Sequence, residues 1–145
     1  MRVILQRVTR ARVVIDNREV GCVGQGLLLL VGIHKDDTPE AIDFLAAKCA
    51  EIRVFADEQS KMNLSLREIH GEALVVSQFT LLGDCRKGRR PSYADAAPPE
   101  KGKELYERFV KQLRKHIPKV QTGVFGAMMQ VELINDGPVT LVMEK

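Results

Sequence analysis

The strongest constraint on the fold is the run Leu27 to Ile33, in which every residue except Gly32 carries an apolar side chain. Successive side chains of a strand point to opposite faces, so this run predicts a strand that is buried on both faces. Residues 2–15 alternate instead, which predicts a strand with one buried face. That face would carry Val3, Leu5, Arg7, Thr9, Ala11, Val13 and Ile15.

Two helices are expected. Thr38-Pro39-Glu40 combines a capping hydroxyl, a first-turn proline and an early carboxylate, and apolar residues then recur at helical spacing, so this helix should end near Arg53. The second is expected over residues 100–116, opened by Pro98-Pro99 and stopped by Pro118.

Strands outnumber helices in the remaining pattern. Further strands are expected over residues 20–23, 54–55, 73–82, 120–134 and 139–143. Residues 83–99 contain glycine and proline breakers and predict a long loop. The chain shows no repeat and no boundary. We therefore expect an α+β fold, a mainly antiparallel sheet or small β-barrel with two packed helices, as a single domain over residues 1–145.

Composition excludes several classes of protein. No apolar run reaches membrane-spanning length, and the first residues carry charge too early for a signal peptide. The three cysteines are odd in number, widely spaced and without a Cys-x-x-Cys pair. They argue against a disulfide framework and a zinc site of the usual spacing, and they favour a reducing compartment. The net charge of +3 permits an acidic partner without requiring one.

The segment Ser77-Gln78-Phe79-Thr80 places polar groups directly after the apolar run 73–76. Such groups need partners, which either the protein or a substrate can supply. A side-chain nucleophile at Ser77 or Thr80 would need a nearby base, and no histidine lies in a triad motif. Backbone N–H groups of Phe79 and Thr80 could instead form an oxyanion hole. The histidines are His34, His70 and His116.

Gly137-Pro138 separates two apolar runs near the end of the chain. It predicts either an ordinary turn or a main-chain corner that approaches a ligand closely, because glycine has no Cβ.

Arg7 lies on the otherwise apolar face of the first strand. Its head either reaches water or is buried against several acceptors, such as carbonyls near a Gly-Pro corner. Met129 is expected to point inward from a strand and pack in the core, whereas Phe125, flanked by small residues, belongs either to the core or to the wall of a pocket.

The run Arg86-Lys87-Gly88-Arg89-Arg90 follows Thr80 by a few residues. It predicts a solvated basic loop, or a surface for the phosphates of a nucleic acid beside a hydrolytic pocket. Cys85, beside these charges, lacks a base motif and is interpreted as a bystander. His70 and Glu72 are two candidate metal ligands, too few for a site.

Together the motifs resemble the D-aminoacyl-tRNA deacylases over essentially the whole chain. The resemblance is carried by Ser77–Thr80 and Asn135–Thr140 and by four further segments in the same order. These are Gln6-Arg7-Val8, Lys61-Met62-Asn63-Leu64, Arg86–Ser92 and Thr122–Ala127.

The resemblance implies an enzyme that hydrolyses the ester between a D-amino acid and tRNA, accepts glycine from glycyl-tRNA mischarged on tRNA-Ala, and rejects L-aminoacyl-tRNA. It implies a homodimer with pockets at the subunit interface. We expect a cytoplasmic protein with no cofactor, no metal site and no membrane association, and the sequence leaves open whether a metal assists. Whether the Thr80 hydroxyl or the 2′-OH of the tRNA attacks stays open.

The resemblance also assigns roles to residues. Ser77, Gln78, Phe79 and Thr80 would form the catalytic wall of the pocket. Gly137 and Pro138, joined by a cis bond, would enter the pocket of the other subunit and exclude L side chains, held by Arg7, Phe125 and Met129. The tRNA-binding residues would be Arg86, Lys87, Arg89 and Arg90.

Two rival hypotheses remain. An RNA-binding module without catalysis could be built on the basic loop, although the sequence lacks interleaved aromatic residues for base stacking. A serine or threonine hydrolase of small esters would need a histidine beside Ser77 or Thr80.

Overall fold

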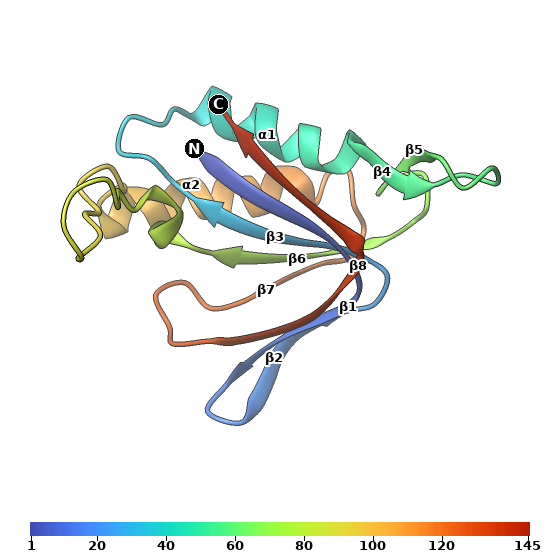
Figure 1. Ribbon diagram of the computed structural model, residues 1–145, viewed down its shortest axis with the longest axis horizontal. Coiled ribbons are helices and arrows are strands. Elements are labelled where there is room, and N and C mark those ends of the chain that lie inside the picture. The colour runs from blue at the N-terminus through green and yellow to red at the C-terminus, as the bar shows by residue number, and fades with distance from the viewer.

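In the computed structural model, which describes residues 1–145, two helices cover one side of a curved sheet (Figure 1). The sheet contains β1 (Arg2–Ile15), β2 (Arg18–Val23), β3 (Gly26–Gly32), β6 (Glu72–Ser77), β7 (Val120–Thr122) and β8 (Gln130–Glu144). The helices are α1 (Pro39–Glu51) and α2 (Pro99–Leu113). A separate ribbon pairs β4 (Arg53–Ala56) with β5 (Met62–Ser65). The α+β prediction is confirmed.

The long strand β1 organises the sheet because it pairs with three others. It is antiparallel to β2, β3 and β8, whereas β3–β6 and β6–β7 are parallel. The strand order is β2-β1-β3-β6-β7, with β8 added on β1. The backbone of Gly21 in β2 approaches Thr122 of β7, so the sheet curls back on itself toward a barrel.

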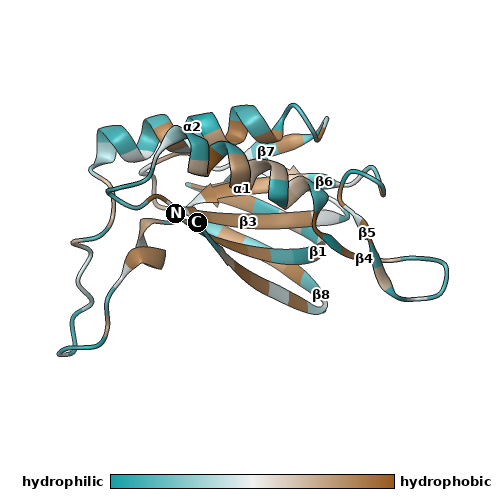
Figure 2. Cartoon of the chain, turned by 90° about the horizontal axis from the view of Figure 1, so that it is seen from above, coloured by the Kyte–Doolittle hydropathy of each residue, from teal (hydrophilic) through white to brown (hydrophobic).

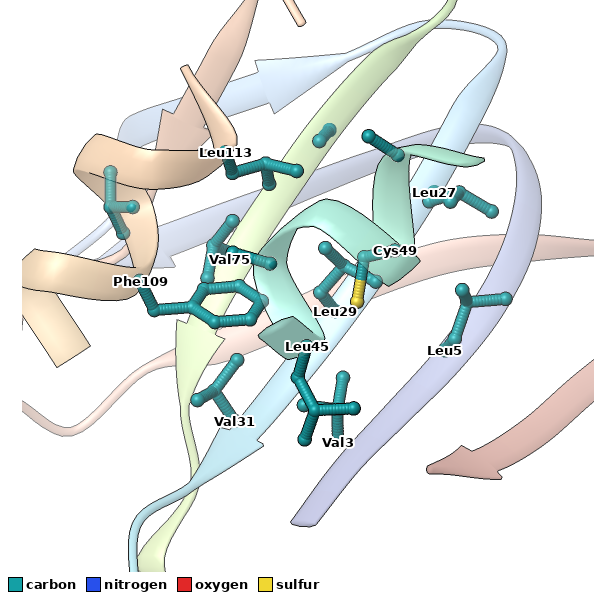
Figure 3. Close-up of a cluster of buried hydrophobic side chains, with 14 of the residues drawn as sticks. Val3, Leu5, Leu27, Leu29, Val31, Leu45, Cys49, Val75, Phe109 and Leu113 are labelled. Atoms are coloured by element: carbon teal, nitrogen blue, oxygen red, sulfur yellow. The ribbon is translucent and has the colours of Figure 1, made fainter. Parts of the chain in front are cut away.

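The central strands β3 and β6 are buried on both faces, as the apolar run predicts. Leu27, Leu29 and Val31 face the helices and pack with Leu45 of α1 and Phe109 of α2 (Figure 3). The opposite face belongs to a second cluster, formed by Val8, Ala11, Val13, Val23, Leu28, Leu74 and Val76. The curl of the sheet therefore covers the face that the helices leave free.

Both helices begin where the sequence predicts. Thr38 caps α1, its hydroxyl accepting from the N–H of Ala41, and a proline occupies the first turn of each helix. α2 ends at Leu113 rather than at His116, because residues 114–116 form turns before Pro118, which disfavours helix in the residue it follows. Neither helix has the length and apolar character to span a membrane.

The expected strand over residues 73–82 is wrong in its second half. β6 ends at Ser77, and Phe79–Leu82 form the short 3-10 helix η1. β3 ends at Gly32, so no further strand partner exists, and the chain folds over that glycine. A Cβ there would lie 2.5 Å from Leu82 Cδ2 and 3.0 Å from the Gln78 carbonyl oxygen. The missing side chain of Gly32 lets the polar segment turn back over the strand end.

The closing strands also have different boundaries. Residues 123–129 form a loop, in which Gly126 has φ +78°, so the strand expected over 120–134 is interrupted. β8 is one strand from Gln130 to Glu144 that contains Gly137-Pro138. It can absorb the irregular residues as a bulge because β1 pairs with it on both sides of them.

Candidate active site

A cavity of about 370 Å³ opens at the end of β6, between the helix layer and the 123–129 loop. Ser77, Gln78 and Phe79 line one side, and Phe125 and Met129 line another, so the structure brings these five predicted residues together. The walls are mostly apolar. The complete lining is Val31, Ile33, Val76, Ser77, Gln78, Phe79, Ala97, Gly102, Tyr106, Phe125, Gly126, Ala127, Met128, Met129 and Val131.

The backbone N–H groups of Phe79 and Thr80 have no acceptor within the chain. Gln78 makes the last bond to β3, from its N–H to the Val31 carbonyl at 2.8 Å. The first bond of η1 is donated by Leu81 to the carbonyl of Gln78, so the two N–H groups in between are unpaired. Two adjacent free donors beside an apolar cavity can bind the oxygen of a polarised carbonyl.

The hydroxyl of Thr80 has no base to activate it. Its Oγ1 accepts a hydrogen bond from Nε2 of Gln78. No histidine hydrogen-bonds to Ser77 or Thr80: Nδ1 of His34 accepts from the N–H of Asp36, and His70 precedes β6 at the far end of the strand. The geometry required for a serine or threonine hydrolase is therefore not assembled.

Tyr106 of α2 positions the cavity, a role that the sequence reasoning missed. Its hydroxyl donates to the carbonyl of Val75 at 2.9 Å, and the N–H of Gly123 donates to the same carbonyl at 3.1 Å. Burial raises the pKa of Tyr106, which keeps the hydroxyl protonated as a donor. Its ring lies 5.8 Å from that of Phe125. The sequence did contain a signal for this role: a tyrosine on the apolar face of a helix has its hydroxyl buried, and a buried hydroxyl needs a hydrogen-bond partner.

Gly137-Pro138 lies on a bulge inside β8. Pairing with β1 continues up to Asn135 and resumes at Thr140, so residues 136–139 have only Arg7 opposite them. The Gly137–Pro138 peptide bond is cis, and Gly137 has φ +125°. Asn135 closes the bulge by donating from Nδ2 to Thr140 Oγ1 at 2.8 Å. The generic interpretation of this pair as a turn before a separate strand is wrong.

The guanidinium of Arg7 is mostly buried and is held by main-chain carbonyls. Its Nε donates to the carbonyl of Asp136 at 3.1 Å and lies 3.2 Å from Oδ2 of the same residue. Its Nη1 donates to the carbonyl of Val54. Of the two alternatives for Arg7, the structure has the buried head with backbone acceptors. The corner at Gly137 is thereby tied to the body of the protein.

Within one chain, the Gly-Pro corner and the cavity lie apart, at different positions along the strands of the sheet. The corner faces Arg7, which pairs with Leu27 of β3, whereas Ser77 of β6 pairs with Val31, four residues further along β3. Four residues correspond to about 13 Å along the strand, and three strand spacings separate β8 from β6 as well. Phe125 and Met129 accordingly lie at the cavity and not at the corner of their own chain.

The basic loop projects from the body of the molecule (Figure 2). Paired backbone bonds between Asp84 and Ser92, of 2.8 and 2.9 Å, close its base. Arg86 binds back to the Asp84 carboxylate, which lowers the pKa of Asp84 to about 2. The other three basic side chains of the loop make no ion pair or hydrogen bond and are free for a ligand. They are Lys87, Arg89 and Arg90.

The family model and the similar proteins of known name point to the same family. The D-Tyr-tRNA(Tyr) deacylase family model matches residues 4–144. A D-aminoacyl-tRNA deacylase of Thermotoga petrophila is 56% identical over 144 residues, covering 99% of this chain and 97% of that protein. A protein of the same name from Exiguobacterium sibiricum is 54% identical over 145 residues and covers 100% of both chains.

Two solved structures share the fold. The c-Myc DNA Unwinding Element Binding Protein matches with a TM-score of 0.95 and 38% identity, over 100% of this chain and 99% of that one. A probable eukaryotic D-amino acid tRNA deacylase matches with a TM-score of 0.84 and 21% identity, over 98% and 97% of the two chains.

We predict that Gly137→Ala destabilises the protein more than Gly88→Ala does. A Cβ at Gly137 would lie 2.8 Å from Nη2 of Arg7, so Arg7 must leave its carbonyl partners, whereas a Cβ at Gly88, also at positive φ, meets nothing within 4 Å. We expect losses of about 2–4 kcal/mol and about 1 kcal/mol in the free energy of unfolding, measured in urea. Equal losses would show that Arg7 does not fix the corner.

Proposed function

Since the chain belongs to the D-Tyr-tRNA(Tyr) deacylase family, we propose that it hydrolyses the ester bond of D-aminoacyl-tRNA and releases tRNA and the free D-amino acid. As a member of this family it is an enzyme, a carboxylic ester hydrolase. We propose that residues 1–145 act as one deacylase domain. The observation that carries the proposal is the unpaired N–H group of Phe79, a residue that lines an apolar cavity of about 370 Å³, followed directly by the unpaired N–H group of Thr80.

In the proposed reaction, the ester carbonyl lies against the Phe79 and Thr80 N–H groups. These donors stabilise the oxyanion of the tetrahedral intermediate, and one such donor typically contributes about 10²–10³ in rate. Thr80 has no base within reach, so its hydroxyl is not the attacking group. The 2′-OH of the terminal ribose of the substrate instead assists the attack of a water molecule on the ester carbonyl. The water oxygen bonds to the carbonyl carbon, the bond to the ribose 3′ oxygen breaks, and that oxygen takes up the proton, so no protein nucleophile and no cofactor is needed.

The complete site requires two copies of the chain. The cavity and the Gly137-Pro138 corner are separated both along and across the sheet of one molecule, so a second copy would have to bring them together. Apolar side chains of β8, Ile134 and Val142, are 46% and 62% exposed, which suits a buried interface. A two-fold homodimer repeats this contact and forms two composite pockets.

Handedness is then sensed by main-chain atoms of the partner. The Gly137-Pro138 corner would lie beside the α-carbon of the substrate, held in place by Arg7 from its own chain and by Phe125 and Met129 of the pocket. An L side chain would clash with this backbone, whereas a D side chain points away from it. Glycine has no side chain to reject, so glycyl-tRNA mischarged on tRNA-Ala is also a substrate. The reaction would proofread chirality during translation.

The proposed partners and location follow from the substrate. The tRNA phosphates would contact Lys87, Arg89 and Arg90, together with Arg86. The protein would act in the cytoplasm, where tRNA is aminoacylated, and its cysteines Cys22, Cys49 and Cys85 are all free.

Matched aminoacyl-tRNAs test both the stereochemistry and the attacking group. Purified protein should hydrolyse D-tyrosyl-tRNA and glycyl-tRNA at least about 100-fold faster than L-tyrosyl-tRNA, because a backbone clash excludes the L form. Thr80→Ala should retain most of the activity, since the N–H group remains. The assay follows release of labelled amino acid. Equal rates on D and L esters would contradict chiral selection, and complete inactivity of a folded Thr80→Ala would identify a hydroxyl nucleophile.

Two complementary variants test whether the pocket is shared between subunits. Ala127→Trp should fill the cavity and Gly137→Ala should displace the corner, so each variant alone should be nearly inactive. Mixed and reassembled, they should recover about a quarter of the wild-type sites, because half of the dimers are mixed and one of their two pockets is intact. Activity on D-tyrosyl-tRNA measures the recovery. No recovery would mean that each chain builds its own site.

The salt dependence of binding tests the proposed tRNA surface. Arg89→Ala should weaken tRNA binding and reduce the slope of log K against log salt by about 0.7–0.9, as expected for one lost phosphate contact. Lys48→Ala removes the same charge from α1, away from the loop, and serves as the control. Filter binding between 50 and 200 mM salt distinguishes them. Equal effects of the two variants would show that the loop affects tRNA binding only through the net charge of the protein.

A further inference from the structure

Phe79 and Tyr93 bring two exposed aromatic rings together beside the cavity. Their centroids lie 5.1 Å apart with an interplanar angle of 67°, an edge-to-face arrangement. The two residues are 58% and 39% exposed. Phe79 lines the cavity, so the pair lies at its wall. Single exposed apolar residues are common, but a cluster of exposed rings beside a functional pocket marks a binding surface.

The fold places Tyr93 at the base of the basic loop. The backbone bonds between Asp84 and Ser92 close the loop directly before Tyr93. The ring packs on the backbone of Gly83, where a Cβ would lie 3.0 Å from Cε1 of Tyr93. Since Gly83 follows η1 directly, the aromatic pair connects the catalytic segment on one side with the basic loop on the other.

We propose that Phe79 and Tyr93 form a stacking platform for an unpaired nucleobase of the tRNA 3′ end, an inference that rests on the proposed function. An aminoacyl group in the cavity brings the single-stranded nucleotides attached to it to the mouth of the cavity. Proteins bind single-stranded RNA by stacking its bases on aromatic rings and by pairing its phosphates with basic side chains. The platform supplies the first element and Lys87, Arg89 and Arg90 supply the second.

The chemistry of the surface favours a base over another apolar ligand. Every nucleobase has a π face, so stacking tolerates any sequence, as suits an enzyme acting on several tRNAs. Another exposed aromatic ring, Phe44 of α1, lies under the ammonium group of Lys145, 4.9 Å from the ring centroid. Phe44 is far from the basic loop in the sequence and lines no part of the cavity, which makes it a control.

The test combines a change in the ring with removal of the base. The probes are two short RNA oligonucleotides that end in a single-stranded 3′ tail, one complete and one with abasic sites in the tail. Tyr93→Leu removes the ring but keeps an apolar side chain, Tyr93→Phe keeps the ring, and Phe44→Leu is the control. Binding is measured at fixed salt, and quenching of a 2-aminopurine in the tail reports stacking.

We expect Tyr93→Leu to weaken binding of the complete RNA about 5- to 150-fold, the range for the loss of one stacked base, and to abolish the quenching. Binding of the abasic RNA should not weaken further, and Tyr93→Phe and Phe44→Leu should match the wild type. With aminoacyl-tRNA, Tyr93→Leu should raise KM more than it lowers kcat, because stacking is the same in the ground and transition states.

Three results would overturn the platform. These are an equal loss on complete and abasic RNA, no loss on either, or a change of the molecular mass in solution that shows the rings to be part of a subunit contact. Because the oligonucleotides carry no aminoacyl group, the binding result does not depend on hydrolysis. Base-dependent binding without deacylation would contradict only the proposed function, and deacylation without base dependence would contradict only the platform.

Discussion

The burial of β3 and β6 on both faces is the constraint on which the rest of the structure depends. One face is covered by α1 and α2, and the other can be covered only if the sheet curls and brings β1, β2 and β8 round it. Two central strands that cannot be exposed must also end in a defined way. They end at Gly32 and Ser77, and the polar segment that follows turns over Gly32. The position of the candidate site is a consequence of how the core is closed.

The candidate site is built mainly from backbone. The proposed oxyanion donors are N–H groups of Phe79 and Thr80, and the proposed chiral selector is the Gly137-Pro138 corner. Main-chain atoms are as rigid as the elements that carry them, and side chains serve as supports. Arg7 holds the corner through carbonyl oxygens, and Tyr106 ties α2 to β6 at the Val75 carbonyl, which also receives the 123–129 loop. Selection by such atoms cannot be relaxed by a change of rotamer.

Local patterns predicted the elements well where periodicity and caps agree. The run Leu27–Ile33, the alternation of residues 2–15 and the Thr38-Pro39 helix start all appear in the structure, because each depends on neighbours within a few residues. The errors fall where distant contacts decide. β6 stops at Ser77 because β3 ends beside it, and the irregular residues of β8 remain in one strand because β1 pairs on both sides of them. Tyr93 and Phe79 are 14 positions apart, so their contact was not visible in the pattern.

The sequence by itself determined the α+β class, the two helices, the motifs that resemble a deacylase family and the residues that belong to them. These properties are encoded in composition, spacing and order, which are one-dimensional. Only the tertiary structure decided that Arg7 is buried against carbonyls, that Ser77–Phe79 meet Phe125 and Met129 in one cavity, and that Gly137-Pro138 lies apart from that cavity along and across the sheet. Those facts depend on the register of strands paired across the sheet, and register is set by the packing of all the layers together rather than by any segment alone.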